Sequence, residues 1–188
     1  VLTVLALPVL AAQPTADWPC VQVLQPHLSL GQVWSGPAPD PKAQPAPEIA
    51  ALADRIVERR MTLAEAEAEI AAFAGTHDAA GLTALMQAAF DRIDRHRALL
   101  IAGISRYGHK QVALAAQVEQ RRERMAELEK ADKPDFDAID AAEAALDWDT
   151  RVFTERQQSL TYVCETPVIL EQRLFALARA ISAHLPQQ

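Results

Sequence analysis

Histidine and carboxylate side chains could bind a metal ion in this chain, but their spacing does not favour a metal site. The sequence has no HxxxH, HExxH or Glu-x-x-His pair, whereas a di-iron helical bundle repeats such residues on several helices. Four aspartates between positions 132 and 140 lack the glycine and terminal glutamate of a calcium loop. We therefore expect no metal and no other cofactor. The residues considered are His27, His77, His96, His109, His184, Asp132, Asp135, Asp137 and Asp140.

Hydroxyl and imidazole groups could also serve nucleophilic catalysis, but no motif supports that role. No GxSxG-type elbow surrounds Ser105, Ser159, Thr161 or Ser182. No two glycines are closer than five positions, which excludes a glycine-rich phosphate loop. His96 falls on an apolar helical stripe, where a hydrogen-bonded core histidine is expected. We therefore predict that the protein is not an enzyme.

The two cysteines, Cys20 and Cys164, point to a different kind of chemistry. Neither lies in a CxxC or CxxCH motif, so redox catalysis and c-type haem attachment are not expected. In an exported chain the pair is most simply one disulfide, the alternative being two unrelated buried thiols. In the chain-entropy model, closing so long a loop stabilises a fold by about 5 kcal/mol.

Residues 1–12, VLTVLALPVLAA, carry no charged side chain. A membrane-spanning helix needs about 20 apolar residues, so this run is too short to be one. It has the length of a secretory h-region, with Val9 and Ala11 at the small-residue positions of a cleavage site. We read it as a truncated export signal, which predicts a periplasmic or secreted protein. The alternative is an apolar N-terminal segment of a cytosolic protein.

Composition limits the fold class and the partners. The chain has 188 residues, which suits one domain with a substantial core. Six glycines in that length argue against all-β and collagen-like folds. The net charge of -7, with no basic block, makes nucleic acid an unexpected partner. Without a Lys/Arg-rich amphipathic face, direct membrane binding is not expected either.

Proline placement separates an N-terminal strap, residues 13–47, from the remainder. Nine of the twelve prolines fall in residues 1–47 and none in 48–133, so the strap cannot be helical. We expect it to lie extended over helices, anchored by Trp18 and Trp34 and fixed at Cys20. Its other large apolar side chains should also be covered, because exposing them is costly. These are Val21, Val23, Leu24, Leu28 and Leu30.

The remainder follows a helical period and predicts an all-α fold. Residues 48–75 should form two short helices, with Pro47 in the first turn of one, a Thr62–Glu65 capping box opening the other, and Gly75 ending it. Residues 76–188 should form a long antiparallel helical hairpin, with arms at about 78–130 and 133–185. The short helices would then make a bundle at its base, leaving a bare hairpin over roughly residues 105–160. Asp132 is the expected N-cap of the second arm, and Pro167 should kink or split that arm.

Both arms carry apolar residues at coiled-coil spacing. In the second arm the steps alternate between three and four for six heptads. In the first arm the seam includes His96 and takes one extra step of four to Ile104, flanked by Gly103 and Gly108. The first-arm seam reads Leu82, Met86, Ala89, Ile93, His96, Leu100, Ile104, Tyr107, Gln111, Leu114, Val118, Arg121, Met125 and Leu128.

Four polar residues, Gln111, Arg121, Asp149 and Arg156, interrupt this seam. Antiparallel pairing about residue 132 should place Arg156 beside residues 107–109 and Asp149 towards residues 114–116. Such residues either fix the register at some cost in stability or mark a loosely packed stretch that awaits a partner helix. All four are candidate partner-binding residues.

Trp148 is the strongest candidate for a partner-binding side chain. It shares one heptad position outside the seam with Tyr162 and Ile169, which the strap or the short helices should cover. An exposed Trp148 would suit a binding hot spot. The alternatives are that the strap reaches it or that it lies flat on its own helix.

These features predict a non-catalytic exported protein that docks on another exported or envelope protein through its hairpin, as a scaffold, assembly factor or chaperone. The alternative is a carrier of a small hydrophobic ligand, held in a crevice between the basal helices and the strap. Outward-facing heptads also allow a homodimer.

Overall fold

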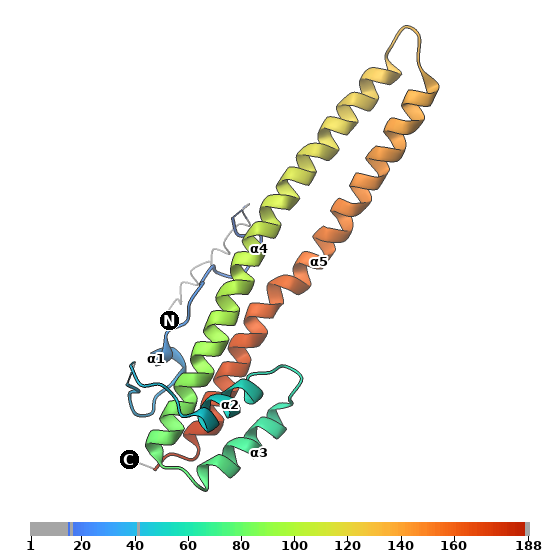
Figure 1. Ribbon diagram of the computed structural model, residues 1–188. Helices are drawn as coiled ribbons and strands as arrows, with labels where there is room; N and C mark the ends of the chain where they lie inside the picture. Colours follow the sequence, from blue (N-terminus) through green and yellow to red (C-terminus); the bar gives the residue numbers. More distant parts are fainter. Residues whose placement is uncertain (1–14, 16, 41, 187–188) are drawn as a thin grey trace, which may run out of the picture. The chain divides into compact units, whose positions relative to one another are not determined.

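The computed structural model describes residues 15, 17–40 and 42–186, so the predicted export signal lies outside the described residues. Every regular element in this part is a helix, which confirms the all-α prediction (Figure 1). The chain divides into two compact units: the first holds residues up to Leu24 with Gly103–Cys164, and the second holds Gln25–Ala102 with Glu165 onward. The helices are α1 (Leu30–Val33), α2 (Pro47–Ile56), α3 (Leu63–Ala74), α4 (Ala79–Glu129) and α5 (Phe136–Ser182).

The ends of the short helices follow the predicted signals. Pro47 occupies the first turn of α2, where its missing N–H costs no helical hydrogen bond. At the start of α3 the Glu65 amide donates to the Thr62 hydroxyl (3.2 Å), and the Thr62 amide donates to the Glu65 carboxylate (2.7 Å). Gly75 directly follows α3. The strap differs in one respect, because α1 adds a single helical turn within it.

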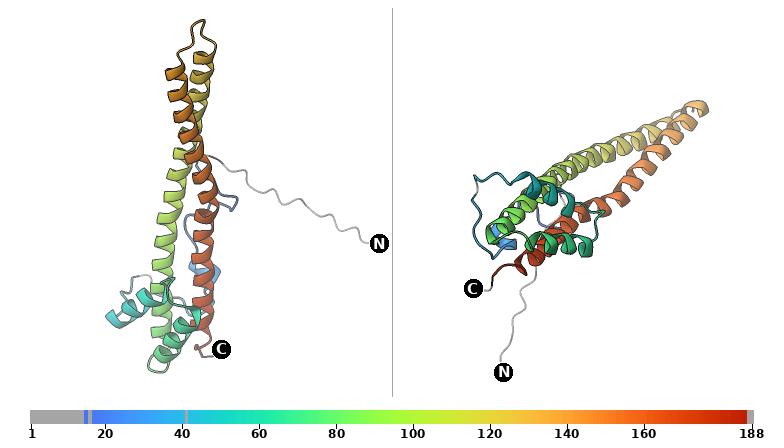
Figure 2. Two further views of the ribbon diagram at one scale, coloured as in Figure 1. Left: turned by 90° about the vertical axis from the view of Figure 1, so that its right-hand side faces the viewer. Right: turned by 60° about the horizontal axis from the view of Figure 1, so that its bottom comes forward.

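The core of the second unit forms where α2 and α3 pack against the first turns of α4 and the last turns of α5 (Figure 2). Each buried aliphatic side chain there contributes about 1.5–3 kcal/mol relative to exposure. The strap covers part of this core with Trp34, which is buried, and with Leu28 and Leu30, which are partly buried. The largest fully buried side chains of this core are Ile56, Ile70, Leu82, Leu85, Met86, Ile93, Leu170, Leu174, Leu177 and Ile181.

The predicted seam of α4 is wrong at His96, which is exposed. The buried positions after Ile93 are Arg97, Ile101 and Ile104, so the extra step of four comes earlier than expected. Arg97 can lie inside because its guanidinium donates to the Gln25 carbonyl and pairs with the Glu171 carboxylate at 3.4 Å. These tertiary partners offset most of the cost of burying the Arg97 charge, which apolar periodicity alone would place on the surface, although Arg97 Nε has no hydrogen-bond partner among the described residues.

In the first unit a disulfide joins Cys20 to Cys164, with the two Cα atoms 5.6 Å apart, which confirms the predicted pair. Trp18 is buried beside it, as expected of an anchor. The expectation that the neighbouring apolar residues are covered is wrong, since Val21, Val23 and Leu24 are exposed. An extended segment can turn only some of its side chains towards the helices it lies on, and Trp18 and Cys20 occupy that side.

The turn between α4 and α5 is longer than expected. The second arm starts at Phe136 rather than near residue 133, and Asp135 replaces Asp132 as the N-cap because its carboxylate accepts from the Ala138 amide at 3.1 Å. Helix α5 then runs through Pro167 to its end, so the expected split does not occur.

Candidate functional site

Two of the polar seam residues form an interhelical network in the first unit. The carboxylate of Asp149, which is 8% exposed, accepts from Gln117 Nε2 at 2.7 Å and from Arg121 Nε. The structure therefore brings Arg121 and Asp149 together, about one turn of α4 beyond the predicted stretch of residues 114–116. Gln117 was not among the predicted seam residues, although it lies one turn before Arg121 on the same face of α4.

The other two polar residues predicted for the seam, Gln111 and Arg156, differ in their burial. Gln111 is buried, and its Nε2 donates to the Phe153 carbonyl at 3.3 Å, whereas its Oε1 has no hydrogen-bond partner. Arg156 lies beside Tyr107, as predicted, but its side chain is exposed rather than in the seam. The Tyr107 hydroxyl donates to the Arg156 carbonyl at 2.8 Å, so the long phenol side chain crosses to the α5 backbone. Burial raises the pKa of Tyr107, and the nearby Arg156 charge opposes that shift.

Trp148 lies on the outer face of α5 with 59% of its surface exposed. The Arg151 guanidinium carbon is 4.8 Å from the centroid of its ring, in the geometry of a cation–π contact within one helix. Tyr162 is 74% exposed, so the expected cover does not extend over most of it, whereas Ile169 is 37% exposed and therefore largely covered. Trp148 and Tyr162 are therefore accessible to a partner.

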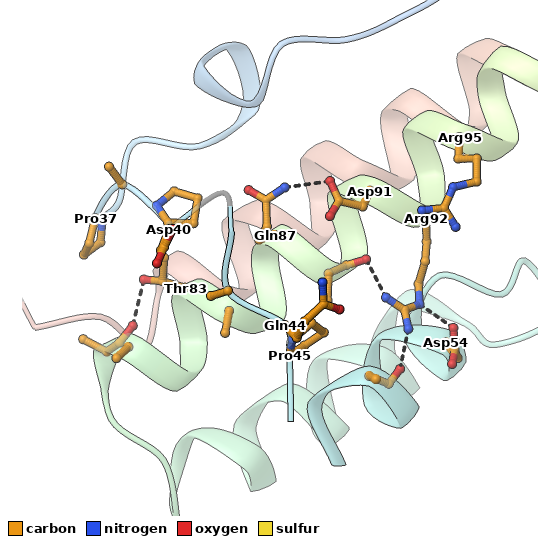
Figure 3. Close-up of a pocket in the computed structure, with 18 residues that line it drawn as sticks. Pro37, Asp40, Gln44, Pro45, Asp54, Thr83, Gln87, Asp91, Arg92 and Arg95 are labelled. Carbon is orange, nitrogen blue, oxygen red and sulfur yellow. Dashed lines mark hydrogen bonds and ion pairs between the residues drawn. The ribbon is translucent and has the colours of Figure 1, made fainter. Parts of the chain in front are cut away.

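The second unit contains a groove with a cavity volume of about 770 Å³. One wall consists of strap residues 37–40 and 43–45, the other is α4 from Ala79 to Arg95, and α2 contributes Ala50 and Asp54 (Figure 3). The expected crevice lay between the basal helices and the strap; this groove lies mainly between the strap and α4, and α3 contributes no lining residue. Its apolar lining consists of small side chains and proline rings: Pro37, Ala38, Pro39, Ala43, Pro45, Ala50, Ala79, Ala80, Ala84 and Ala88.

The polar lining of the groove is partly neutralised. Arg92 pairs with Asp54 and also donates to the Ala50 carbonyl at 3.1 Å, and its hydrogen bond lowers the pKa of Asp54. Asp91 accepts from Gln87 Nε2 at 2.6 Å. Arg95 also lines the groove, and no dashed line joins it to the other residues drawn in Figure 3. Asp40, Asp91 and Arg95 lie outside the Arg92–Asp54 ion pair, so the charged lining of the groove is net negative.

In the described part of the chain, the His, Cys, Asp and Glu side chains form no group of three or more that could hold a metal ion. None of its helices combines the length and the apolar composition needed to cross a membrane. Comparison with protein-family models, curated proteins and solved structures gave no match. Function is therefore inferred from the side chains of the two units.

Proposed function

We propose that this chain is a non-catalytic, exported helical protein that docks on a partner protein through the hairpin of its first unit, as a scaffold, assembly factor or chaperone. The observation that carries the proposal is the exposure of Trp148, whose ring is held by Arg151. Tryptophan and arginine are both enriched among residues that dominate binding energy.

The surroundings of Trp148 suit a close-packed contact. Ala144 and Ala141, about one and two turns earlier on the same side of α5, are also exposed and offer no bulk that would keep a partner away from the indole. Residues 131–165 carry nine Asp and Glu against three Lys and Arg, a net charge of -6. We therefore expect a partner surface with an apolar pocket and a positive rim, since opposite potentials steer association.

Export is supported by the disulfide, because such bonds persist in oxidising compartments and are rare in the cytosol. Together with the apolar residues 1–12, this supports a periplasmic or secreted location. Mass spectrometry after thiol blocking in intact cells would test it. Recovery of both cysteines as blocked free thiols would contradict it.

The docking proposal is tested by photocrosslinking in the native compartment, with a benzophenone amino acid at Ala144. One dominant partner should be captured, and Trp148→Ala should weaken its binding at least 30-fold, the effect of losing a hot spot worth about 2 kcal/mol. Phe136→Ala is the matched control, because Phe136 is an aromatic residue of α5 that is 73% exposed. Equal binding by the Trp148 variant and the unmodified protein would refute the proposal, and crosslinks only between copies would indicate a homodimer.

A carrier of a small ligand is the second candidate function, and the groove in the second unit favours it. Its alanine and proline lining offers apolar surface, and its volume lies in the range of known ligand pockets. A thermal-stability screen with fatty acids and other small hydrophobes would test this function. A melting temperature that no ligand shifts would argue against it.

A further inference from the structure

We propose that the partner of the hairpin is a second copy of this chain, and that each copy inserts Trp148 into a hollow on helix α4 of the other. The inference rests on the proposed function, in which Trp148 is the docking side chain, and names the partner. It involves only the first unit, which contains both arms of the hairpin from Gly103 to Cys164.

The hollow lies on the surface of α4 and has a volume of about 490 Å³. Two of its lining residues are alanines, and the other four have longer polar side chains, two of them arginines. Hot-spot side chains bind in pockets that exclude water, and arginine stacks on aromatic rings. The hollow therefore provides the apolar surface and the positive charge that suit an indole on an acidic helix. Its lining residues are Ala113, Ala116, Gln117, Gln120, Arg121 and Arg124.

Trp148 and the hollow lie at the same height along the hairpin. Gln117 and Arg121, which line the hollow, both donate to the carboxylate of Asp149, the residue after Trp148. A two-fold rotation about an axis parallel to the hairpin leaves every residue at its own height and sets α5 of one copy against α4 of the other. Each Trp148 then stands at the level of the other copy's hollow, as the self-complementary contact of a two-fold dimer requires.

Trp148 and the hollow also lie on the same face of the hairpin. Trp148 directly precedes the seam residue Asp149, and Gln120 of the hollow directly precedes the seam residue Arg121. Seen from one end, two antiparallel helices wind in opposite senses, so residues at the same heptad position turn to the same face. A partner that covers this face therefore contacts both the indole and the hollow.

The strap is attached on another side of α5. Cys164 holds the strap through its disulfide, and it lies 16 positions after Trp148. At 3.6 residues per turn this step places the two side chains about 160° apart around the helix. On the side of Trp148, Ala141, Ala144 and Glu155 are also exposed. This side of α5 is therefore open to a second copy.

Charge favours contact between α5 of one copy and α4 of the other. Residues 131–165, which include the α5 arm, have a net charge of -6. Residues 103–130, the α4 arm, carry six Lys and Arg against four Asp and Glu, a net charge of +2. The parallel two-fold arrangement pairs arms of opposite sign, whereas contact between the two α5 arms would bring like charges together.

The face is large enough for a stable dimer. The α5 arm from Phe136 to Cys164 is about 43 Å long at the rise of an α-helix, and two helices side by side are about 20 Å wide. The face therefore offers about 900 Å² on each copy, and a stable interface buries about 800 Å² per partner.

The test follows self-association of the full purified chain by sedimentation equilibrium. The unmodified protein should form a dimer, and Trp148→Ala should weaken it at least 30-fold, the loss expected for a hot spot. Ala113→Glu should cause a comparable loss, because it fills the hollow and adds a charge that the acidic α5 arm repels. Ala115→Glu is the matched control, because it adds the same charge at an exposed position of α4 outside the hollow.

A second measurement tests how the copies are arranged. A benzophenone amino acid is placed at Gln120, and this chain is mixed with unmodified chain labelled with ¹⁵N. Crosslinks should join Gln120 to residues 144–152 of the labelled copy. Crosslinks from Gln120 to α4 of the labelled copy instead would show that like arms meet, and would overturn the inference.

Other outcomes separate this inference from the proposed function. A chain that stays monomeric up to millimolar concentration, and whose Ala144 crosslinker captures a different protein only when Trp148 is present, would overturn the inference and leave the proposed function standing. A dimer that neither Trp148→Ala nor Ala113→Glu weakens would place the contact elsewhere and overturn the inference. A monomer that captures no protein through Trp148 would refute both.

Discussion

Replacing Asp149 with alanine tests whether the polar network in the seam holds the two helices of the first unit in register. The change removes the acceptor of two hydrogen bonds, one from Gln117 at 2.7 Å and one from Arg121. A hydrogen bond to a charged group contributes about 1.5–3 kcal/mol when both groups are buried. The Asp149 side chain is 11% exposed, but that of Arg121 is 40% exposed, so solvent screens their ion pair.

We therefore expect Asp149→Ala to lower the free energy of unfolding by about 1 kcal/mol, because both donors, the exposed Gln117 and the partly exposed Arg121, can bond to water instead. Arg121→Ala should cost about 1 kcal/mol, because the arginine can still reach water. The interaction energy between the two positions, taken from the double mutant, should be about 1 kcal/mol. Urea unfolding monitored by circular dichroism measures all three values.

Asp147→Ala is the matched control, because it removes the same charge from an exposed position two residues earlier on α5. Its effect should stay within about 0.5 kcal/mol. If Asp147→Ala and Asp149→Ala cost the same, or if the interaction energy with Arg121 is close to zero, the network does not specify the register. The stretch would then be better described as a loosely packed seam that a partner helix completes.

Three further predictions concern the strap and the short helices. Gly36→Ala should destabilise the protein by about 1–3 kcal/mol in thermal unfolding, because a Cβ there would overlap the buried Trp34 ring. Gly31→Ala should not, because a Cβ there would meet only the Ser29 hydroxyl, at an ordinary contact distance of 3.9 Å. Reducing the disulfide should make the strap sensitive to protease before the helices unfold, and unchanged cleavage would show that the bond does not hold it. The hydrogen bond from Arg92 lowers the pKa of Asp54 in the folded state. The stability that this bond gives is therefore present above the pKa of Asp54 in the unfolded chain and is lost as the pH falls through its pKa in the folded protein. In the Arg92→Gln variant, an NMR titration should show the pKa of Asp54 rising towards its ordinary value.

Features set by local physics could be predicted from the sequence. The proline in the first turn of α2 and the capping box at Thr62 depend on residues within four positions of each other, so the chain itself specifies them. The all-α fold and the long paired helices follow from apolar periodicity. The Cys20–Cys164 disulfide was predictable for a simpler reason, since two cysteines allow only one intramolecular pair.

The features that only the tertiary structure reveals depend on contacts between residues distant in the sequence. His96 and Arg97 are adjacent, and only the Gln25 carbonyl and the Glu171 carboxylate decide that the arginine is the buried one. The groove arises in the same way, because prolines of the strap come to face alanines of α4 more than 30 positions away. Neither wall has any sequence signal of a binding site by itself. Periodicity shows which face of a helix is apolar, but the free energy of burying a polar group depends on what lies opposite it in the fold.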